Sequence, residues 1–589
     1  MGHDGPGRRK LIKDRKNLQL LSRMKAIPIS NMNACCSPDG EKGERAMMDY
    51  PLLLRTFLLR AAKYFPKKEV VSVYPNHEIF RYTYADYFKR TCQLAHALES
   101  LGVKRGDHVA SMALNTHRHL ELYFGVPCMG AALHTTNFRL PLHHLVYIIN
   151  HAEDKVLFVD EDLVFIIDAI KDQLKTVEHF VIMSQSGKMP QTGLKPVYLY
   201  DDLISRFPES YDFPDDLSEW DPAMICYTSA TTGDPKGVVY SHRGLVLHSY
   251  AAGCTLRVSE NDCALHIVPM FHANAWGGPF GCVGFGCKQI LPGRETINME
   301  AICRVIADEQ VTFTAGVPTI WLMLYNYLEG GGKYDFSSLK TIVSGGSACP
   351  RFLMEALNEK YGFPIMQAYG MTETSPLAMV AIPKSSMADW PKEKLYDVKS
   401  SAGILAPGLE MKIVNEKGQE VKADGQEWGE ILLRGPWVAN EYYKDPERSK
   451  PYFKGGWLHT GDVGTIDEEG YVRLIDRTKD LVKSGGEWIS SVDLENLIMA
   501  HPAVLEAAVI GIPHSKWVER PLGCVVVKPG QTVTEEALRE FLKDKVKAVW
   551  WIPDHFAFID QIPKTSVGKF SKKELREMVA NGKIPLPVE

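Results

Sequence analysis

Residues 223–237 read AMICYTSATTGDPKG, an apolar run that leads into hydroxyl residues, glycines and one lysine. A hydroxyl-rich loop with glycine, placed after a strand, can wrap phosphate groups with its hydroxyls and backbone N–H groups. Lys236 adds a positive charge, and the pattern G-x-x-x-x-G-K-[ST] of a Walker A loop is absent. A polar surface turn is the alternative, but the length of the pattern favours a phosphate-binding loop.

Short apolar runs alternate with helical segments before and after this loop. Apolar residues recur at helical spacing between Leu54 and Phe65, and Pro318 marks the start of another helix. Runs typical of buried strands occur at 156–159, 180–183, 311–315, 339–343 and 364–369. This alternation predicts an α/β fold, with a large N-terminal region of mixed, largely parallel sheets flanked by helices.

The pattern changes after about Arg473. Residues 504–512 and 523–527 have the composition of strands. A helix is expected between Thr534, a residue that suits an N-cap, and Lys547. These elements predict a small α+β unit of ordinary domain size.

The chain of 589 residues is too long for one core, because cores stop growing at roughly 250–300 residues. We therefore predict an N-terminal domain at 47–475 and a mobile C-terminal domain at 476–589. The hinge is expected at Asp476, within a dense polar stretch. Residues 1–46 are predicted to be a disordered basic tail.

Composition excludes several classes of protein. The formal net charge of -5 shows no basic excess, so no nucleic acid is expected as a partner. The 12 cysteines form no C-x-x-C pair, which argues against a zinc site and favours reduced thiols in a cytoplasmic protein. No apolar run reaches the roughly 18–20 residues of a transmembrane segment. Through the basic residues at 8–16, the expected contact with a membrane is weak and peripheral.

Further motifs follow the phosphate loop in a fixed order. They are PMFHANAWG at 269–277, VSGGSA at 343–348, QAYGMTET at 367–374, WLHTGD at 457–462, DRTKD at 476–480, KSGGEWISS at 483–491 and PKTSVGK at 563–569. Together with the phosphate loop they resemble the adenylate-forming, or AMP-binding, enzymes, which include acyl-CoA synthetases, luciferases and peptide-synthetase adenylation domains. Two stretches, 271–276 and 483–491, most resemble bacterial medium- and long-chain fatty acyl-CoA synthetases. Ala230 stands where the family usually has glycine.

The resemblance implies ATP, Mg²⁺ and coenzyme A. Thr228 and Glu373 would contact Mg²⁺, because hydroxyl and carboxylate oxygens are hard donors. Asp462 would accept hydrogen bonds from the ribose, and Tyr369 would pack on adenine. The implied nucleotide contacts are Thr228, Ser229, Thr231, Thr232, Gly233, Lys236, Gly346, Gln367, Ala368, Tyr369, Thr372, Asp462, Arg477, Lys479, Lys483 and Trp488.

Lys569, His272 and Glu373 are the implied catalytic residues. The Lys569 ammonium would offset negative charge while a carboxylate attacks the α-phosphorus. His272 would orient the acid or shift to admit the thiol. After a domain rotation at Asp476, Gly485 and Gly486 would line the pantetheine passage of coenzyme A.

The expected acid is a fatty acid. Residues 273–287 contain no charged side chain, whereas an amino-acid pocket usually supplies an acidic partner. Ala273 would border the acyl group, and Trp276 resembles a gating tryptophan of the fatty acid tunnel. We therefore predict an AMP-forming fatty acid–CoA ligase, with a homodimer as one expected state. Transfer to a carrier protein, a luciferase-like oxygenase and a non-catalytic lipid-binding protein remain alternatives.

Overall fold

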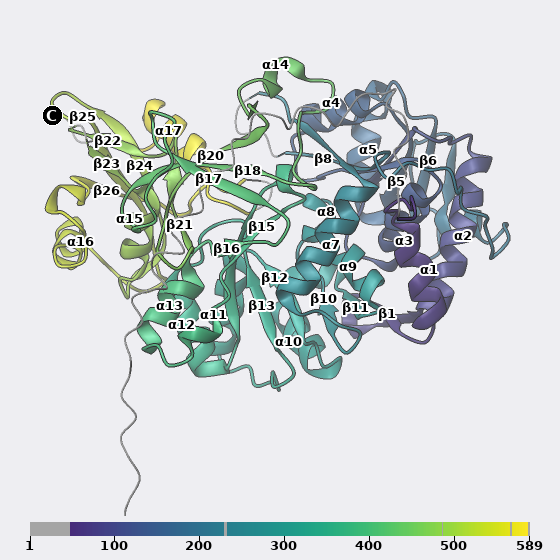
Figure 1. Ribbon diagram of the computed structural model, residues 1–589, viewed down its shortest axis with the longest axis horizontal. Helices are drawn as coiled ribbons and strands as arrows, with labels where there is room; N and C mark the ends of the chain where they lie inside the picture. The colour runs from purple at the N-terminus through teal and green to yellow at the C-terminus, as the bar shows by residue number, and fades with distance from the viewer. Residues whose placement is uncertain (1–46, 229–232, 486, 566–567, 587–589) are drawn as a thin grey trace, which may run out of the picture. The chain divides into compact units, whose positions relative to one another are not determined.

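The computed structural model describes residues 47–228, 233–485, 487–565 and 568–586. The predicted basic tail at 1–46 lies outside the described residues, as do Ser229, Thr231, Thr232 and Gly486 of the predicted site. Residues Pro51–Glu589 group into one compact unit that contains four β-sheets (Figure 1).

Sheet 1 has nine strands in the order β16-β15-β14-β13-β12-β10-β11-β1-β2. Its central strands are parallel, and antiparallel pairs occur at β1–β2, β14–β15 and β15–β16. The bounds are β1 Glu69–Val73, β2 Ile79–Thr83, β10 Cys263–Leu265, β11 Lys288–Leu291, β12 Phe313–Gly316, β13 Thr341–Ser344, β14 Ile365–Gly370, β15 Leu377–Val380 and β16 Ile404–Leu405.

Sheet 2 has seven strands in the order β7-β6-β5-β3-β4-β8-β9. Every pair is parallel except the hairpin β8–β9, which carries the predicted phosphate loop. The bounds are β3 His108–Met112, β4 Ala132–Thr135, β5 Asp154–Asp160, β6 His179–Met183, β7 Val197–Leu199, β8 Pro222–Tyr227 and β9 Gly237–Ser241.

Helices cover both faces of these sheets, because their strands are apolar on each side. One apolar cluster lies between the two sheets, together with α1 Arg55–Tyr64, α2 Tyr84–Ser100, α3 His117–Cys128, α7 His242–Leu256 and α9 Gly278–Phe285. The outer face of sheet 1 packs on α10 Met299–Asp308, α11 Pro318–Glu329 and α12 Arg351–Tyr361. The outer face of sheet 2 packs on α4 Leu142–Ala152 and α5 Val164–Ile170.

A third sheet is antiparallel throughout. It contains β17 Glu410–Val414, β18 Trp428–Arg434, β19 Phe453–Lys454, β20 Trp457–Ile466 and β21 Val472–Arg477. Shorter helices accompany it and the sheets before it: α6 Tyr200–Ile204, α8 Ala273–Trp276, α13 Lys392–Ser400 and α14 Pro446–Ser449. The sequence patterns did not single out this sheet.

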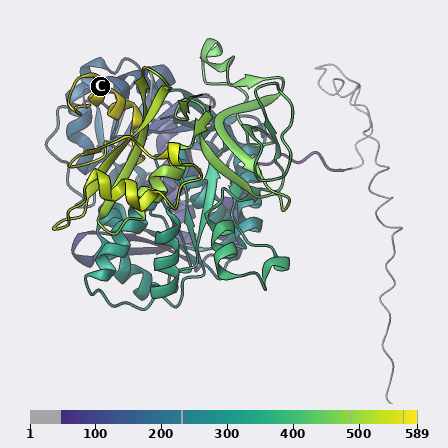
Figure 2. The same ribbon diagram turned by 90° about the vertical axis from the view of Figure 1, so that its left-hand side faces the viewer.

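The C-terminal part is a fourth sheet between helices (Figure 2, yellow-green). Alternate residues of β24 and β25 face two different apolar clusters, so helices cover both faces. The bounds are β22 Val482–Ser484, β23 Glu487–Ile489, α15 Ser491–Met499, β24 Val504–His514, β25 Val518–Val527, α16 Glu535–Leu542, β26 His555–Phe558 and α17 Lys572–Ala580.

The predicted fold class is confirmed, and several element boundaries differ by a few residues from the prediction. The predicted helix from Thr534 ends at Leu542 instead of Lys547, because the chain turns at Lys545, whose backbone N–H bonds the Leu542 carbonyl. The strand predicted to begin at Val311 begins at Phe313. Strand β21 ends at Arg477, one residue beyond the predicted hinge.

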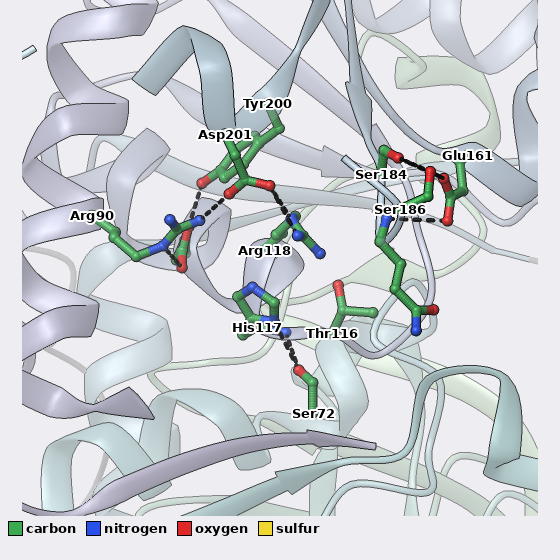
Figure 3. Close-up of polar contacts among 12 residues, drawn as sticks. Ser72, Arg90, Thr116, His117, Arg118, Glu161, Ser184, Ser186, Tyr200 and Asp201 are labelled. Carbon is green, nitrogen blue, oxygen red and sulfur yellow. Dashed lines mark hydrogen bonds and ion pairs between the residues drawn. The ribbon is translucent and has the colours of Figure 1, made fainter. Parts of the chain in front are cut away.

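A partly buried ion-pair network joins α2, α3 and α6 beside sheet 2 (Figure 3). Glu121 is fully buried and accepts hydrogen bonds from Arg90 at 2.7 Å and from the Tyr200 hydroxyl at 2.6 Å. Arg90 and Arg118 both reach Asp201, at 2.7 and 2.9 Å. A buried carboxylate requires such partners, so the network has a structural role. Among the described residues, no helix combines the length and the hydropathy needed to cross a membrane.

Gly403 lies at the junction of sheet 1 with sheet 3, where it forms a bridge with Val472. Its φ is +105°, and a Cβ at this position would lie 2.1 Å from the carbonyl carbon of Val380. We expect Gly403→Ala to lower stability by about 2–4 kcal/mol, since backbone would have to move. Thermal unfolding scans would measure this loss. Gly418→Ala is the control, because φ is also positive there (+74°) and no atom lies within 4 Å; an equal loss in both variants would contradict the junction argument.

Candidate active site

A cavity of about 890 Å³ opens where sheet 1, sheet 3 and the C-terminal part meet. It gathers most of the described residues that the sequence motifs predicted. From the motifs, the lining includes Thr228, Lys236, His272, Ala273, Trp276, Gly346, Gln367, Ala368, Tyr369, Thr372, Glu373, Asp462, Arg477, Lys479 and Lys569.

The phosphate loop begins and ends at two hydrogen bonds between Thr228 and Lys236. The Thr228 N–H donates to the Lys236 carbonyl at 2.9 Å, and the Lys236 N–H donates to the Thr228 hydroxyl at 3.2 Å. These bonds continue the β8–β9 hairpin to the base of the loop. Gly233, inside the loop, has φ +76°, a conformation that glycine adopts without strain.

The polar wall opposite the loop is built around Asp462 of β20. Its carboxylate accepts a hydrogen bond from the Tyr369 hydroxyl at 2.6 Å and pairs with Arg477 Nε at 3.2 Å. The coulombic field of Asp462 raises the pKa of Arg477. Gln367 holds the neighbouring loop, because its side chain accepts from the Cys349 N–H at 3.0 Å and donates to the Ser347 carbonyl at 2.9 Å.

Glu373 lies in a short 3₁₀ turn, Thr372–Thr374, that follows β14. It is 6% exposed, and its Oε1 accepts a hydrogen bond from the Tyr442 hydroxyl at 2.7 Å. Glu373 and Thr228 line the same cavity, and both offer hard oxygen donors. Two protein oxygens are a fitting set for Mg²⁺, which usually keeps waters and takes further oxygens from phosphates.

The part of the cavity predicted to take the acyl group begins at a left-handed turn. The φ angles of Ala273, Asn274, Ala275 and Trp276 are 42°, 55°, 49° and 56°. Such a conformation costs roughly 1–2 kcal/mol per residue that is not glycine, so surrounding contacts must hold it. The buried side-chain oxygen Oδ1 of Asn274 accepts from Cys226 Sγ at 3.2 Å and from the Thr135 hydroxyl at 3.4 Å.

The strained turn places the Trp276 ring beside the glycine loop after β13. A Cβ on Gly345 would lie 3.1 Å from this ring, and Gly346 has φ +82°. His272 precedes the turn, and burial, followed by the charges of Lys569 and Arg139, lowers its pKa to about 3. The imidazole is therefore neutral at physiological pH and can act as a hydrogen-bond donor and acceptor.

Lys569 reaches the cavity from the C-terminal part. A Cβ placed on Gly346 would lie 3.6 Å from Lys569 Cε, so the lysine stem runs directly along the glycine loop. Burial, with the Arg477 charge adding to it, lowers the pKa of Lys569 to about 8, although Asp462 and Glu373 act in the opposite direction. The ammonium thus faces both the polar wall and the turn that carries His272.

Three predicted residues of the β22–β23 hairpin do not line the cavity: Lys483, Gly485 and Trp488. Lys483 Nζ lies 5.2 Å from the Trp488 ring centroid, and the Gly485 N–H donates to the Trp517 carbonyl at 2.9 Å. The hairpin also reaches sheet 3, because the Trp488 ring packs edge to face on Trp428 with centroids 6.2 Å apart. Its predicted role toward coenzyme A stays a prediction.

Sequence reasoning did not identify two residues that shape the site. Tyr442 contacts both Glu373 and Lys236, and Asn274 anchors the left-handed turn. Asn274 stands inside the quoted 269–277 motif, and asparagine adopts positive φ more readily than other residues with a side chain, so it offered a signal. Tyr442 lies in an ordinary polar and aromatic stretch, and nothing in its local pattern marks it.

The sequence is similar to known proteins along most of its length. The family described as "AMP-binding enzyme" matches residues 58–443, and "AMP-binding enzyme C-terminal domain" matches residues 493–569. A long-chain-fatty-acid–CoA ligase of Thermus thermophilus is 46% identical over 538 residues, covering 91% of this chain and 97% of the relative.

Two further similarities concern a second ligase and a solved structure. A medium-chain-fatty-acid–CoA ligase of Ectopseudomonas oleovorans is 39% identical over 533 residues, covering 90% of this chain and 96% of the relative. The crystal structure of the anthranilate CoA ligase AuaEII with anthranoyl-AMP superposes with a TM-score of 0.80 at 27% identity, covering 91% of this chain and 99% of that chain.

The depressed pKa of Lys569 gives a direct test of the site's electrostatics. We expect its amine to be acylated by acetic anhydride with a midpoint near pH 8, measured by mass spectrometry of the labelled peptide. In urea the midpoint should return to about 10.4, because burial is lost. Arg477→Gln should move the folded midpoint upward, since it removes a neighbouring positive charge. A folded midpoint equal to that in urea would contradict the buried placement.

Proposed function

We propose that this chain, which belongs to the AMP-binding enzyme family, uses a fatty acid as the acid of an AMP-forming acyl-CoA ligase reaction. The observation that carries the proposal is the lining of one cavity, which combines charged and polar residues with a group of apolar residues. A polar part holds Thr228, Glu373, Asp462 and Lys569, and an apolar lobe extends from Trp276. ATP fits the first part, and an acyl chain fits the second.

The first half-reaction joins the acid to AMP. A carboxylate oxygen attacks the α-phosphorus of ATP, the bond to the bridging oxygen breaks, and pyrophosphate leaves with that electron pair. Lys569 offsets the negative charge that builds on the phosphate oxygens. The neutral imidazole of His272 orients the acid through a hydrogen bond. Because the imidazole carries no charge, Lys569 stays the positive group that faces the reacting oxygens.

Nucleotide recognition follows from the polar wall. Asp462, held by Tyr369 and Arg477, accepts hydrogen bonds from the ribose hydroxyls. The Tyr369 ring and the loop held by Gln367 border the adenine. Thr228 and Glu373 would hold Mg²⁺, which supplies charge neutralisation of the phosphates when bound.

The apolar lobe is the part of the cavity whose lining comes from α7, α9, the residue Val258 after α7, and β12. It is lined by Ala252, Gly253, Leu256, Val258, Gly281, Cys282, Phe285 and Phe313. None of these side chains is charged, so an apolar acyl chain gains about 0.8 kcal/mol for each methylene that it buries there. An acid with a charged tail would have to leave its hydration shell without a partner.

The second half-reaction needs a different arrangement of the C-terminal part, 476–589. The thiol sulfur of coenzyme A attacks the adenylate carbonyl, loses its proton and expels AMP. Lys569 occupies the cavity now, whereas Lys483, Gly485 and Trp488 lie outside it. A rotation at Asp476 would exchange them. Asp476 is buried and accepts hydrogen bonds from the N–H groups of Arg477 and Ser491, both at 2.8 Å, so the hinge has defined contacts to break.

The remaining proposals concern the setting of the reaction. We place the enzyme in the cytoplasm, since the ten described cysteines are free thiols and nine of them are buried. We also propose that the protein forms a homodimer and makes weak peripheral contact with membranes through the basic residues at 8–16.

Lys569→Ala should reduce acid-dependent ATP–pyrophosphate exchange by about 10²–10³-fold, because one preorganised positive group at the α-phosphate is lost. Exchange should be measured across acids from acetate to palmitate, and thioester formation after adding coenzyme A. Exchange with fatty acids but no thioester would move the acceptor to a carrier protein. No exchange with any acid in folded protein would favour a lipid-binding role instead.

Gly281→Leu should shift the chain-length preference of the enzyme toward shorter acids. A Cβ on Gly281 would meet only ordinary contacts, 3.8 and 4.0 Å from the Phe285 ring, so a side chain can enter the lobe. A leucine there takes space from about three methylenes, which lowers kcat/KM for the longest good substrate at least tenfold. Gly281→Ala is the matched control and should keep the wild-type profile. A Gly281→Leu profile unchanged in chain length would place the acyl chain elsewhere.

A further inference from the structure

Lys236, the last residue of the phosphate loop before β9, faces two aromatic rings. Its Nζ lies 4.2 Å from the ring centroid of Tyr442 and 3.9 Å from that of Tyr452. The two rings meet edge to face, with centroids 5.6 Å apart and an interplanar angle of 79°. The ammonium therefore sits in the corner between two ring faces, where their negative electrostatic potential attracts it.

Tyr442 also contacts the carboxylate that is proposed to hold Mg²⁺. Its hydroxyl donates to Glu373 Oε1 at 2.7 Å, which leaves Oε2 available to other ligands. The ring is 1% exposed and packs edge to face on Phe453 at 5.2 Å. The Tyr442 N–H donates to the Ser449 hydroxyl at 2.9 Å. Backbone and ring are thus both held, so the hydroxyl has little freedom to move.

We propose that Tyr442 is a positioning residue that serves two groups of the nucleotide site at once. Its hydroxyl fixes the orientation of Glu373, and its ring, with that of Tyr452, holds the Lys236 ammonium toward the cavity before ATP binds. The inference rests on the proposed function, because it assigns Tyr442 a part in the binding of Mg²⁺ and ATP.

The chemistry of the three contacts fits this role. The Tyr442 hydroxyl is the donor in this pair, because a carboxylate oxygen only accepts hydrogen bonds. A hydrogen bond from a neutral donor to a carboxylate is stronger than one between neutral groups. The rings occupy only part of the surface of the ammonium, which has three N–H donors, so Lys236 can bind a phosphate oxygen while it keeps the cation–π contact. A lysine already ordered by the rings loses less side-chain entropy when it binds.

The test compares three variants. Tyr442→Phe removes the hydroxyl and keeps the ring, and Tyr442→Leu removes both. Tyr443→Phe is the matched control, because Tyr443 is the adjacent tyrosine, also has a lysine ammonium, of Lys444, 5.0 Å from its ring centroid, and does not line the cavity. ATP binding would be measured by titration calorimetry without any acid, at a series of Mg²⁺ concentrations.

We expect Tyr442→Phe to raise the Mg²⁺ concentration for half-maximal ATP binding about tenfold, as for the loss of one hydrogen bond to a charged group. Its affinity for ATP at saturating Mg²⁺ should stay near that of the wild type. Tyr442→Leu should weaken ATP binding about threefold more, even at saturating Mg²⁺, since the ring contact to Lys236 is also lost. Tyr443→Phe should match the wild type in both respects.

A wild-type Mg²⁺ dependence in Tyr442→Phe would overturn the inference, as would an equal shift in Tyr443→Phe. If Tyr442→Leu does not fold, Tyr442→Phe decides alone, because it changes only one hydroxyl. Wild-type protein that binds ATP but catalyses no exchange with fatty acids would refute the proposed acid, while the calorimetry would still decide the role of Tyr442. Wild-type protein that binds no ATP would overturn both.

Discussion

The buried carboxylate of Asp462 needs hydrogen-bonding partners, and these partners come from different parts of the molecule. Asp462 belongs to the antiparallel sheet 3, yet its partners are Tyr369 from sheet 1 and Arg477 from the end of β21. A charge removed from water requires hydrogen bonds of good geometry, and here two separate elements supply them. The same contacts fix sheet 3 against sheet 1 and set the point at which the chain leaves for its C-terminal part.

The cavity that results separates charge from apolar surface. Lys569, Arg477 and Lys479 face Asp462 and Glu373 in the polar part, which favours an anionic ligand with several oxygens. On the acyl side, His272 is kept neutral by burial and by the Lys569 charge. His272 and Lys569 can therefore orient the carboxylate of the acid together. Only Lys569 is positively charged, so His272 adds no second charge at the mouth of the apolar lobe.

Backbone strain is concentrated where the two parts meet. Four successive residues, Ala273 to Trp276, adopt left-handed φ angles, and the Asn274 side chain anchors them to β4 and β8. Strain of this kind persists only where surrounding contacts determine the conformation. Its effect is to present the Trp276 ring to the glycine loop at 345–346, between the polar part and the lobe. The same glycine loop also contacts Lys569. The left-handed turn, the glycine loop and the segment that carries Lys569 therefore meet at Gly345 and Gly346.

The sequence by itself determined the α/β class, the parallel strands and fifteen of the residues that line the cavity, among them most of its charged and polar motif residues. Apolar runs buried on both faces specify such strands locally, and phosphate-binding motifs must keep particular residues adjacent in the chain. Contacts between distant segments carry no such local pattern. Only the tertiary structure placed Tyr442 between Lys236 and Glu373, which are separated from it by 206 and 69 residues, and set the left-handed turn at 273–277. It also decided that Lys569 enters the cavity while Lys483, Gly485 and Trp488 stay outside, because that choice depends on how the C-terminal part packs on the rest of the chain.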